Sequence, residues 1–265
     1  MTITTRKTAL ITGASAGIGA AYADRLAKRG YDLVLVARRA DRLQALAEQL
    51  SAAHGVKAQT LVADLATDEG QARVAQVLSN DPTISVLVNN AGVARLAPIE
   101  GSPLEDSLSQ LALNITALTR LTHAALPGMK ARKEGQIINI ASVLAVHSMP
   151  ISSVYSGSKA YVLAFSRGLQ QELADTGVKV QVVLPAATAT EIWDKSGVPL
   201  AALDSATVMT TDNLVNAAFA ALDQGESIVW PSVADTTLFE RFEAARVALF
   251  SASQTSKVAP HLLQA

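Results

Sequence analysis

The sequence predicts an α/β fold in which a doubly wound parallel β-sheet is flanked by helices. Three observations carry this prediction. Short apolar segments alternate with longer segments of helical spacing. The apolar segments are hydrophobic on both faces, as strands of a covered parallel sheet are. Repeated βα units of this length are typical of a doubly wound sheet, and 265 residues suit a single domain of this kind.

The first half of the chain supplies four expected strands and three expected helices. The run TALITG is apolar and ends in glycine, and the helical segment after it stops at Gly30, a common residue past a helix C-terminus. Thr67 can cap the third helix. We expect strands at 8–13, 31–37, 56–64 and 84–92, and helices at 17–29, 41–53 and 67–79.

The second half continues the alternation. We expect a long helix at 103–132 with Pro127 near its end, a strand at 135–142, a helix at 153–175, a strand at 178–185 and a helix near 212–223. The segment 186–211 mixes small residues with Trp193 and suits a lid on the substrate side. Residues 234–265 form an expected C-terminal helix and tail, in which 238–250 is read as amphipathic. We find no repeat or linker, so residues 1–265 are predicted to form one domain.

Composition excludes several classes of protein. The net charge is −1 with both signs interspersed, which gives no basic surface for nucleic acid. There is no cysteine for a disulfide, a thiolate metal site or a nucleophile, and the four histidines lack zinc-site spacing. No uninterrupted apolar run reaches the roughly 20 residues of a membrane span. We therefore expect a cytoplasmic protein without metal, membrane or nucleic-acid partners.

A glycine-rich turn, TGASAGIG at 12–19, lies between the first strand and the first helix. Gly13 permits a tight turn, Gly17 lets the backbone approach a phosphate, and Gly19 lets the helix pack close to the sheet. The helix N-terminus then offers free N–H groups to an anion. A turn without any ligand is the alternative, but the position after the first strand favours binding of a dinucleotide.

Four motifs together resemble the short-chain dehydrogenase/reductase family, whose Rossmann-type fold binds a nicotinamide dinucleotide. They are the TGxxxGxG turn, Asn89-Asn90-Ala91-Gly92 after the fourth strand, Ser142, and the YxxxK pair Tyr155 and Lys159. Asn114 matches the family's fourth catalytic position. The resemblance runs from about residue 6 to about residue 230 in the family's order and spacing. It implies contacts to the cofactor by Gly13, Ser15, Gly17, Ile18, Gly19, Asn90, Ala91 and Gly92.

The end of the second strand bears on the choice of cofactor. In dinucleotide folds an acidic residue there binds the ribose 2′-hydroxyl of NAD, whereas an arginine accommodates the 2′-phosphate of NADP. Here Ala37 replaces the acidic residue and Arg38-Arg39 follows. We expect NADP(H) to be favoured over NAD(H), with Arg38 as the phosphate contact and Arg39 as the solvated charge.

Two further cofactor contacts follow from the resemblance. It places Asp64 at the adenine amine with Leu65 beside it, although a strand-end aspartate can also cap the next helix. After the sixth strand the family has Pro-Gly and then a threonine at the nicotinamide carboxamide. Pro185 matches and Ala186 replaces the glycine. Thr190 is the expected contact and Thr188 the alternative.

The catalytic prediction centres on Tyr155. An unperturbed tyrosine is a poor base at neutral pH because its pKa is about 10. Lys159 lies one helical turn further on, and its positive charge favours the phenolate. The resemblance implies that Lys159 also holds the nicotinamide ribose and that Asn114 holds a water that relays protons. Tyr155 then exchanges a proton with the carbonyl or alcohol oxygen, while Ser142 hydrogen-bonds the same oxygen.

The substrate is expected to be an uncharged ketone, aldehyde or secondary alcohol with apolar groups. The segments 143–151 and 192–193 on the substrate side are mostly apolar. Family members are often homodimers or homotetramers, and we expect the same of this chain. Alternatives are an NAD(H)-dependent dehydrogenase of the same fold, a non-catalytic dinucleotide-binding regulator, and a dehydratase or epimerase. The regulator predicts damage to the four catalytic positions, and none is damaged.

Overall fold

The computed structural model describes residues 6–263 and divides the chain into two compact units. The first ends at Pro231 and the second begins at Ser232, and each is described by itself. The prediction that all 265 residues form a single domain stays a prediction.

The first unit is built on a seven-stranded parallel sheet with the order β3-β2-β1-β4-β5-β6-β7. The order reverses between β1 and β4, which creates the crevice where open α/β sheets bind ligands. The sequence did not predict β7, which has only two residues. The strands are β1 (Thr8–Thr12), β2 (Asp32–Ala37), β3 (Ala58–Val62), β4 (Ile84–Asn89), β5 (Gly135–Ile140), β6 (Val178–Val183) and β7 (Ile228–Val229).

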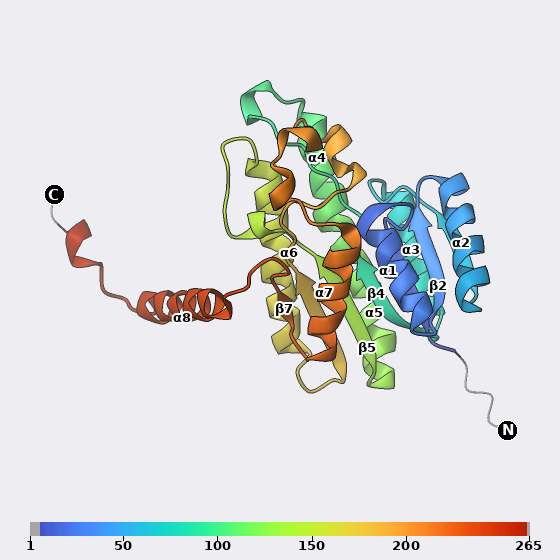
Figure 1. Ribbon diagram of the computed structural model, residues 1–265. Helices are drawn as coiled ribbons and strands as arrows, with labels where there is room; N and C mark the ends of the chain where they lie inside the picture. The colour runs from blue at the N-terminus through green and yellow to red at the C-terminus, as the bar shows by residue number, and fades with distance from the viewer. Residues whose placement is uncertain (1–5, 264–265) are drawn as a thin grey trace. The chain divides into compact units, whose positions relative to one another are not determined.

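Helices cover both faces of this sheet, as expected (Figure 1). The core on one face joins α1 (Gly17–Lys28), α2 (Ala40–His54) and α7 (Thr211–Asp223) to the inner strands, and its largest buried side chain is Tyr22. The core on the other face joins α3 (Asp68–Asn80), α5 (Leu118–Arg132) and α6 (Ser153–Glu172). Thr67 caps α3 as predicted, since its hydroxyl accepts from Gly70 N at 3.1 Å.

The helix expected at 103–132 is interrupted. It divides into α4 (Leu104–Leu111), a π-helical segment at Ala112–Ala117, and α5. π-Helical turns inside α-helices are rare and are frequently found at functional sites. This one contains the buried side chain of Asn114, which bonds outside the helix. Apolar spacing does not reveal such a turn because the hydrophobic pattern continues through it.

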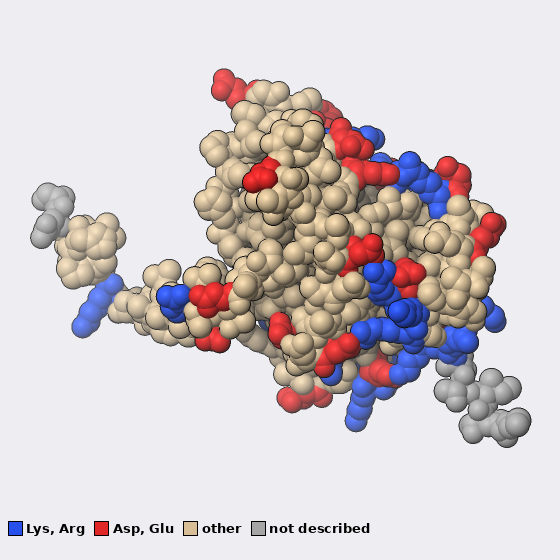
Figure 2. Space-filling model, in the orientation of Figure 1, with Lys and Arg blue, Asp and Glu red and all other residues tan. Residues whose placement is uncertain are grey.

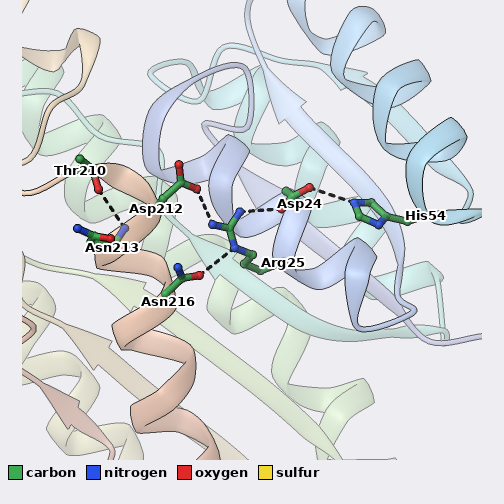
Figure 3. A network of polar contacts seen from close by, with 7 residues as sticks. All are labelled: Asp24, Arg25, His54, Thr210, Asp212, Asn213 and Asn216. Carbon is green, nitrogen blue, oxygen red and sulfur yellow. Dashed lines mark hydrogen bonds and ion pairs between the residues drawn. The ribbon is translucent and has the colours of Figure 1, made fainter.

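A polar network ties α1, which carries the glycine turn, to its neighbours (Figure 3). Arg25 on α1 donates to Asp24 at 2.7 Å and, on α7, to Asp212 at 2.5 Å and Asn216 at 3.0 Å. Asp24 also bonds His54 at the end of α2, at 3.0 Å. Burial alone would raise the pKa of Asp24. The hydrogen bonds with His54 and Arg25 outweigh burial and lower this pKa. The network fixes α1 between two helices from distant parts of the chain.

The expected lid contains three short 3-10 turns, at Glu191–Lys195, Leu200–Ala202 and Ser205–Thr207. Its start is fixed by a bridge between Thr188 and Met209. Ser196 O accepts from Leu96 N at 2.6 Å, and Arg95 bonds the carbonyl of Lys195. The lid is therefore attached to the loop after β4 by its backbone.

The second unit consists mainly of α8 (Thr236–Ser253). The helix exists as predicted, but the expected single apolar stripe is not found. At 100° per residue, Leu238, Phe242, Val247 and Phe250 point to several sides, and all are exposed. In Figure 2 this unit is mostly tan, with a few blue and red side chains. Along residues 6–263, no helix combines the length and hydropathy that crossing a bilayer requires.

Candidate active site

A cavity of about 890 Å³ opens at the carboxyl ends of the strands. One end is formed by the glycine turn and the segments that follow β2 and β3. The other end is formed by Tyr155, Lys159 and the lid. This volume lies within the range of small-molecule sites. The cavity brings together every predicted site residue except Gly19 and Asn114, which lie just behind its wall: Gly13, Ser15, Gly17, Ile18, Arg38, Asp64, Leu65, Asn90, Ala91, Gly92, Ser142, Tyr155, Lys159, Pro185, Thr188 and Thr190.

The glycine turn needs its glycines for different reasons. Gly13 has φ +66° and Gly17 has φ +57°, a region that side chains strongly disfavour. Gly19 has no such angle, but a Cβ there would overlap Gly13 O and lie 2.6 Å from Asn90 Nδ2. The turn therefore keeps its shape only with these residues.

The N-terminus of α1 suits a diphosphate. Ala16 at the N-cap provides no side-chain hydrogen bond, and the first turn contains no acidic residue. The N–H groups of this turn have no intrahelical acceptor and carry a partial positive charge. The residues present thus fit the diphosphate of a dinucleotide.

Thr12 fixes the loop after β4 against the glycine turn. Its hydroxyl accepts from Asn90 N at 2.9 Å and from Ala91 N at 3.0 Å, and donates to Val88 O at 3.1 Å. Asn90 Nδ2 donates to Thr12 O at 2.9 Å. Asn90 and Ala91 therefore line the cavity from a rigid position. Thr12 belongs to the TGxxxGxG motif, but the sequence alone indicates no role for its side chain.

At the end of β2 three arginines line the cavity instead of one. Arg38 is exposed and forms no hydrogen bond or ion pair with any other residue of the described range. Arg39, which we expected to be a solvated charge, donates to Ser15 Oγ at 3.2 Å and 2.9 Å. It also pairs with Glu191 of the lid, as does Arg42 on α2. No pattern in the sequence indicates these contacts of Arg39, Arg42 and Glu191.

Asp64 at the end of β3 does not cap α3, because Thr67 is the N-cap. One carboxylate oxygen accepts from Ala66 N at 3.0 Å, which stabilises the turn before α3. The side chain nevertheless lines the cavity beside the buried Leu65. A contact from Asp64 to an adenine amine is therefore compatible with its structural bond and stays a prediction.

Tyr155 and Lys159 lie one turn apart on α6, and Lys159 Nζ is 5.8 Å from the Tyr155 ring centroid. Lys159 is buried and donates to Ile140 O, at the end of β5, at 2.9 Å. Burial lowers the pKa of Lys159 to about 8. The lysine is held in one place, and its proton is easily removed compared with that of a lysine in water.

Burial raises the pKa of Tyr155 to about 12, and a hydrogen bond with Ser142 acts in the opposite direction. In the protein alone, the removal of water around the phenol thus outweighs the expected effect of Lys159. The reason is distance, since an ammonium 5.8 Å from the ring centre favours the phenolate less than burial disfavours it. The phenol of Tyr155 is therefore protonated at neutral pH.

Ser142 follows β5 and caps the 3-10 turn at Val143–Ala145. Its hydroxyl accepts from Leu144 N at 3.1 Å and donates to Pro185 O at 3.5 Å. A structural cap was the alternative to catalysis, but Ser142 also lies near enough to Tyr155 to act on the pKa of its phenol. Ser142 is thus held where its hydroxyl and that of Tyr155 face the same part of the cavity.

Asn114 uses its side chain to hold the loop after β4. Oδ1 accepts from Val93 N at 3.0 Å, and Nδ2 donates to Val93 O at 2.9 Å and to Ser158 Oγ at 3.0 Å. A Cβ on Gly92 would lie 3.2 Å from Asn114 Oδ1 and 3.6 Å from Lys159 Nζ, so both groups face Gly92. One lone pair of Oδ1 is still free to accept, and a role in a water relay stays a prediction.

The bend after β6 does not need the glycine that the family has there. Ala186 does not have positive φ, since Lys133 is the one non-glycine residue with positive φ within 6–263. Thr190 lies against the glycine turn, as a Cβ on Gly17 would be 3.1 Å from its Cγ2. Thr188 is buried and donates to Ala186 O at 3.1 Å. Thr190 is better placed for a cofactor contact than Thr188.

Comparison with known proteins agrees with this geometry. Residues 7–198 match the family model for short chain dehydrogenases. An NADPH complex of a short-chain dehydrogenase from Sphingobium yanoikuyae is 41% identical, with a TM-score of 0.92 over 96% of this chain and 98% of that one. A bulky-bulky ketone specific alcohol dehydrogenase from Comamonas testosteroni is 35% identical, with a TM-score of 0.88 over 98% of this chain and 100% of that one.

Curated relatives share part of their length with this chain. The very-long-chain 3-oxoacyl-CoA reductase-A of Danio rerio is 35% identical over 190 residues, which are 70% of this chain and 59% of that protein. The human 17-beta-hydroxysteroid dehydrogenase type 3 is 38% identical over 69% of this chain and 59% of its own length. The family match, the parallel sheet and the geometry around Tyr155 lead to one conclusion: this chain belongs to the short-chain dehydrogenase/reductase family of oxidoreductases.

Proposed function

We propose that this protein is an NADP(H)-dependent carbonyl reductase that interconverts ketones carrying bulky apolar groups with their secondary alcohols. The observation that carries the proposal is the cavity itself. Tyr155, Lys159 and Ser142 lie in the same cavity as the glycine turn. Beyond them the wall is mostly apolar and includes Leu144, Met149, Ile151, Ile192, Trp193 and Leu203.

The residues fit a nicotinamide dinucleotide and would hold it along the strand ends. The glycine turn and the N-terminus of α1 receive the diphosphate, Arg38 the 2′-phosphate, and Asp64 with Leu65 the adenine. Lys159 receives the nicotinamide ribose, and Thr190 the carboxamide. The bound cofactor supplies the hydride. That NADPH complexes exist among similar structures supports this assignment.

Tyr155 acts as the general acid in reduction. Because burial raises its pKa to about 12, the phenol is protonated at neutral pH and donates its proton to the carbonyl oxygen. Ser142 hydrogen-bonds the same oxygen and stabilises the charge that develops there. Lys159, with its pKa lowered by burial, returns a proton toward Tyr155, and Asn114 positions the loop beside it. In oxidation the same groups act in reverse.

The apolar wall supports bulky, uncharged substrates. Ketones with a large group on each side of the carbonyl would bury apolar surface against Leu144, Met149 and Trp193. The match to the bulky-bulky ketone specific alcohol dehydrogenase extends over the whole of that chain, whereas the match to the 3-oxoacyl-CoA reductase extends over 59% of it. This difference favours bulky ketones over 3-oxoacyl-CoA thioesters as substrates.

A ketone panel followed by the loss of NADPH or NADH absorbance tests the proposal. The panel contains a diaryl ketone, acetone and a 3-oxoacyl-CoA. We expect the highest kcat/KM for the diaryl ketone with NADPH, and a shift toward NADH in Arg38→Asp. Preference of the wild type for NADH overturns the cofactor assignment. If no ketone causes the absorbance of NADPH or NADH to fall, the protein is a non-catalytic dinucleotide-binding regulator instead.

A homodimer or homotetramer and a cytoplasmic location belong to the same proposal. The exposed apolar side chains of α8, which include Leu249 and Phe250, support self-association. Light scattering and cell fractionation test the two statements separately.

A further inference from the structure

One carboxylate of the lid lies between two arginines at the cofactor end of the cavity. Glu191 Oε2 accepts from Arg39 Nη1 at 2.6 Å, and Oε1 accepts from Arg42 Nη1 at 2.5 Å. The Arg39 bond, followed by the Arg42 bond, lowers the pKa of Glu191. The three side chains are 39%, 47% and 47% exposed for Arg39, Arg42 and Glu191. Both ion pairs of Glu191 thus lie at the rim of the cavity, where water and ligands reach them.

The same arginines lie where a dinucleotide fold places the adenosine ribose. Arg39 is held to the glycine turn through Ser15 Oγ, and it follows β2 directly. Arg42 is in the first turn of α2. Guanidinium groups recognise phosphate and carboxylate with the same planar fork of donors. A 2′-phosphate bound by the neighbouring Arg38 would therefore also meet Arg39 and Arg42, which already hold a carboxylate.

Glu191 also connects this end of the cavity to the lid. It begins the 3-10 turn Glu191–Lys195, which contains Trp193. Trp193 lines the cavity and donates from Nε1 to Thr188 O at 2.7 Å. The other end of the turn is held by a separate hydrogen bond, in which Leu96 N donates to Ser196 O at 2.6 Å. Glu191 is therefore the tie between the Trp193 end of the lid and the arginines.

We propose that Glu191 determines the choice of cofactor by competing with the 2′-phosphate for Arg39 and Arg42, so that NADP(H) displaces it and releases the turn Glu191–Lys195 from these arginines, whereas NAD(H) leaves it in place. This inference rests on the proposed NADP(H) function. Exposed ion pairs contribute little to stability, so a ligand can break this one. A phosphate carries more charge than a carboxylate and can occupy both arginines.

Calorimetry with two nucleotides tests the competition without turnover. Adenosine 2′,5′-bisphosphate carries the 2′-phosphate, and 5′-AMP lacks it. Removal of the competing charge in Glu191→Gln should tighten binding of the bisphosphate about threefold to tenfold and leave 5′-AMP within about twofold. Asp194→Asn is the matched control, because Asp194 lies in the same turn and lines the cavity but forms no ion pair in the range 6–263. It should change neither affinity.

Trp193 gives a second, independent signal. A Trp230→Phe background leaves Trp193 as the single tryptophan. Addition of the bisphosphate should increase quenching of Trp193 by acrylamide, and 5′-AMP should not. In Glu191→Gln the quenching should be high before any ligand is added. If the Trp230→Phe background does not fold, as judged by circular dichroism, the calorimetry alone decides.

The outcomes separate this inference from the proposed function. If the wild type does not bind the bisphosphate at all, the NADP(H) assignment is wrong and the competition falls with it. If the wild type binds it and Glu191→Gln binds no more tightly, the competition is wrong while the cofactor assignment stands. Weaker binding by Glu191→Gln would show that Glu191 positions the arginines. An equal gain in Asp194→Asn would show a general charge effect, which also overturns the inference.

Discussion

The buried ammonium of Lys159 should make the fold less stable at neutral pH than in mild alkali. Burial lowers its pKa from 10.5 to about 8. Between these two values the unfolded chain binds a proton that the native chain lacks, so the free energy of unfolding rises with pH. Lys159→Met removes this group and should remove that part of the pH dependence.

The size of the effect follows from the two pKa values. Each unit of difference corresponds to about 1.4 kcal/mol. Near pH 7 the native state is destabilised by about 3 kcal/mol, and near pH 9.5 by about 1.4 kcal/mol, which leaves a gain of about 2 kcal/mol over this interval. Tyr155, whose pKa is raised to about 12, stays protonated in the native state throughout.

Urea unfolding at several pH values measures this gain. The quantity of interest is the difference between wild type and Lys159→Met, because the other titrating groups are common to both proteins. We expect the wild type to gain about 2 kcal/mol on the variant from about pH 7 to about pH 9.5. A difference that stays constant over this interval would refute the claim that the charged lysine is penalised in the native state.

Three further predictions concern the turn, the π-helical segment and the second unit. Gly19→Ala should weaken NADPH binding at least about tenfold, because the new Cβ would lie 2.6 Å from Asn90 Nδ2. Gly168→Ala is the control, because its new Cβ would have no atom within 4 Å. This control should leave NADPH binding unchanged and stabilise α6 by about 0.5–1 kcal/mol. Equilibrium binding and urea unfolding measure both, and equal affinities for the two variants would contradict the packing argument. Asn114→Ala should destabilise the fold by about 2 kcal/mol, because Val93 N and O lose their partner, and an unfolding curve that matches the wild type would speak against this role. Removal of all residues after Pro231 should lower the number of chains per particle in light scattering, and an unchanged number would exclude α8 from assembly.

Six of the seven strands and the position of the cavity could be predicted, because short apolar runs mark these strands in the sequence. Each strand is a short apolar run with a turn residue after it, and parallel strands deliver their carboxyl ends to one edge. Gly13 therefore lies in one cavity with Tyr155 and Lys159, although it is far from both in the chain. The interruption of the helix at Ala112–Ala117 could not be seen, because it depends on bonds between Asn114 and the distant Val93.

The electrostatics of the site depended on tertiary structure. The spacing of Tyr155 and Lys159 suggested a phenol made acidic by its neighbour, but burial decides the pKa of both groups. Arg38 and Arg39 could not be ranked from their order in the chain either. Arg39 bonds Ser15 and Glu191, and Glu191 lies about 150 residues further on. Only the folded lid brings that carboxylate to the arginines.

The central claim is that Tyr155 transfers the proton in NADPH-dependent carbonyl reduction. Single-turnover oxidation of bound NADPH by a diaryl ketone, in wild type and Tyr155→Phe, tests it most directly. We expect the variant to bind NADPH within about threefold of the wild type and to transfer hydride at least about a hundredfold more slowly. Hydride transfer at the wild-type rate in Tyr155→Phe, with the cofactor bound, would contradict the account.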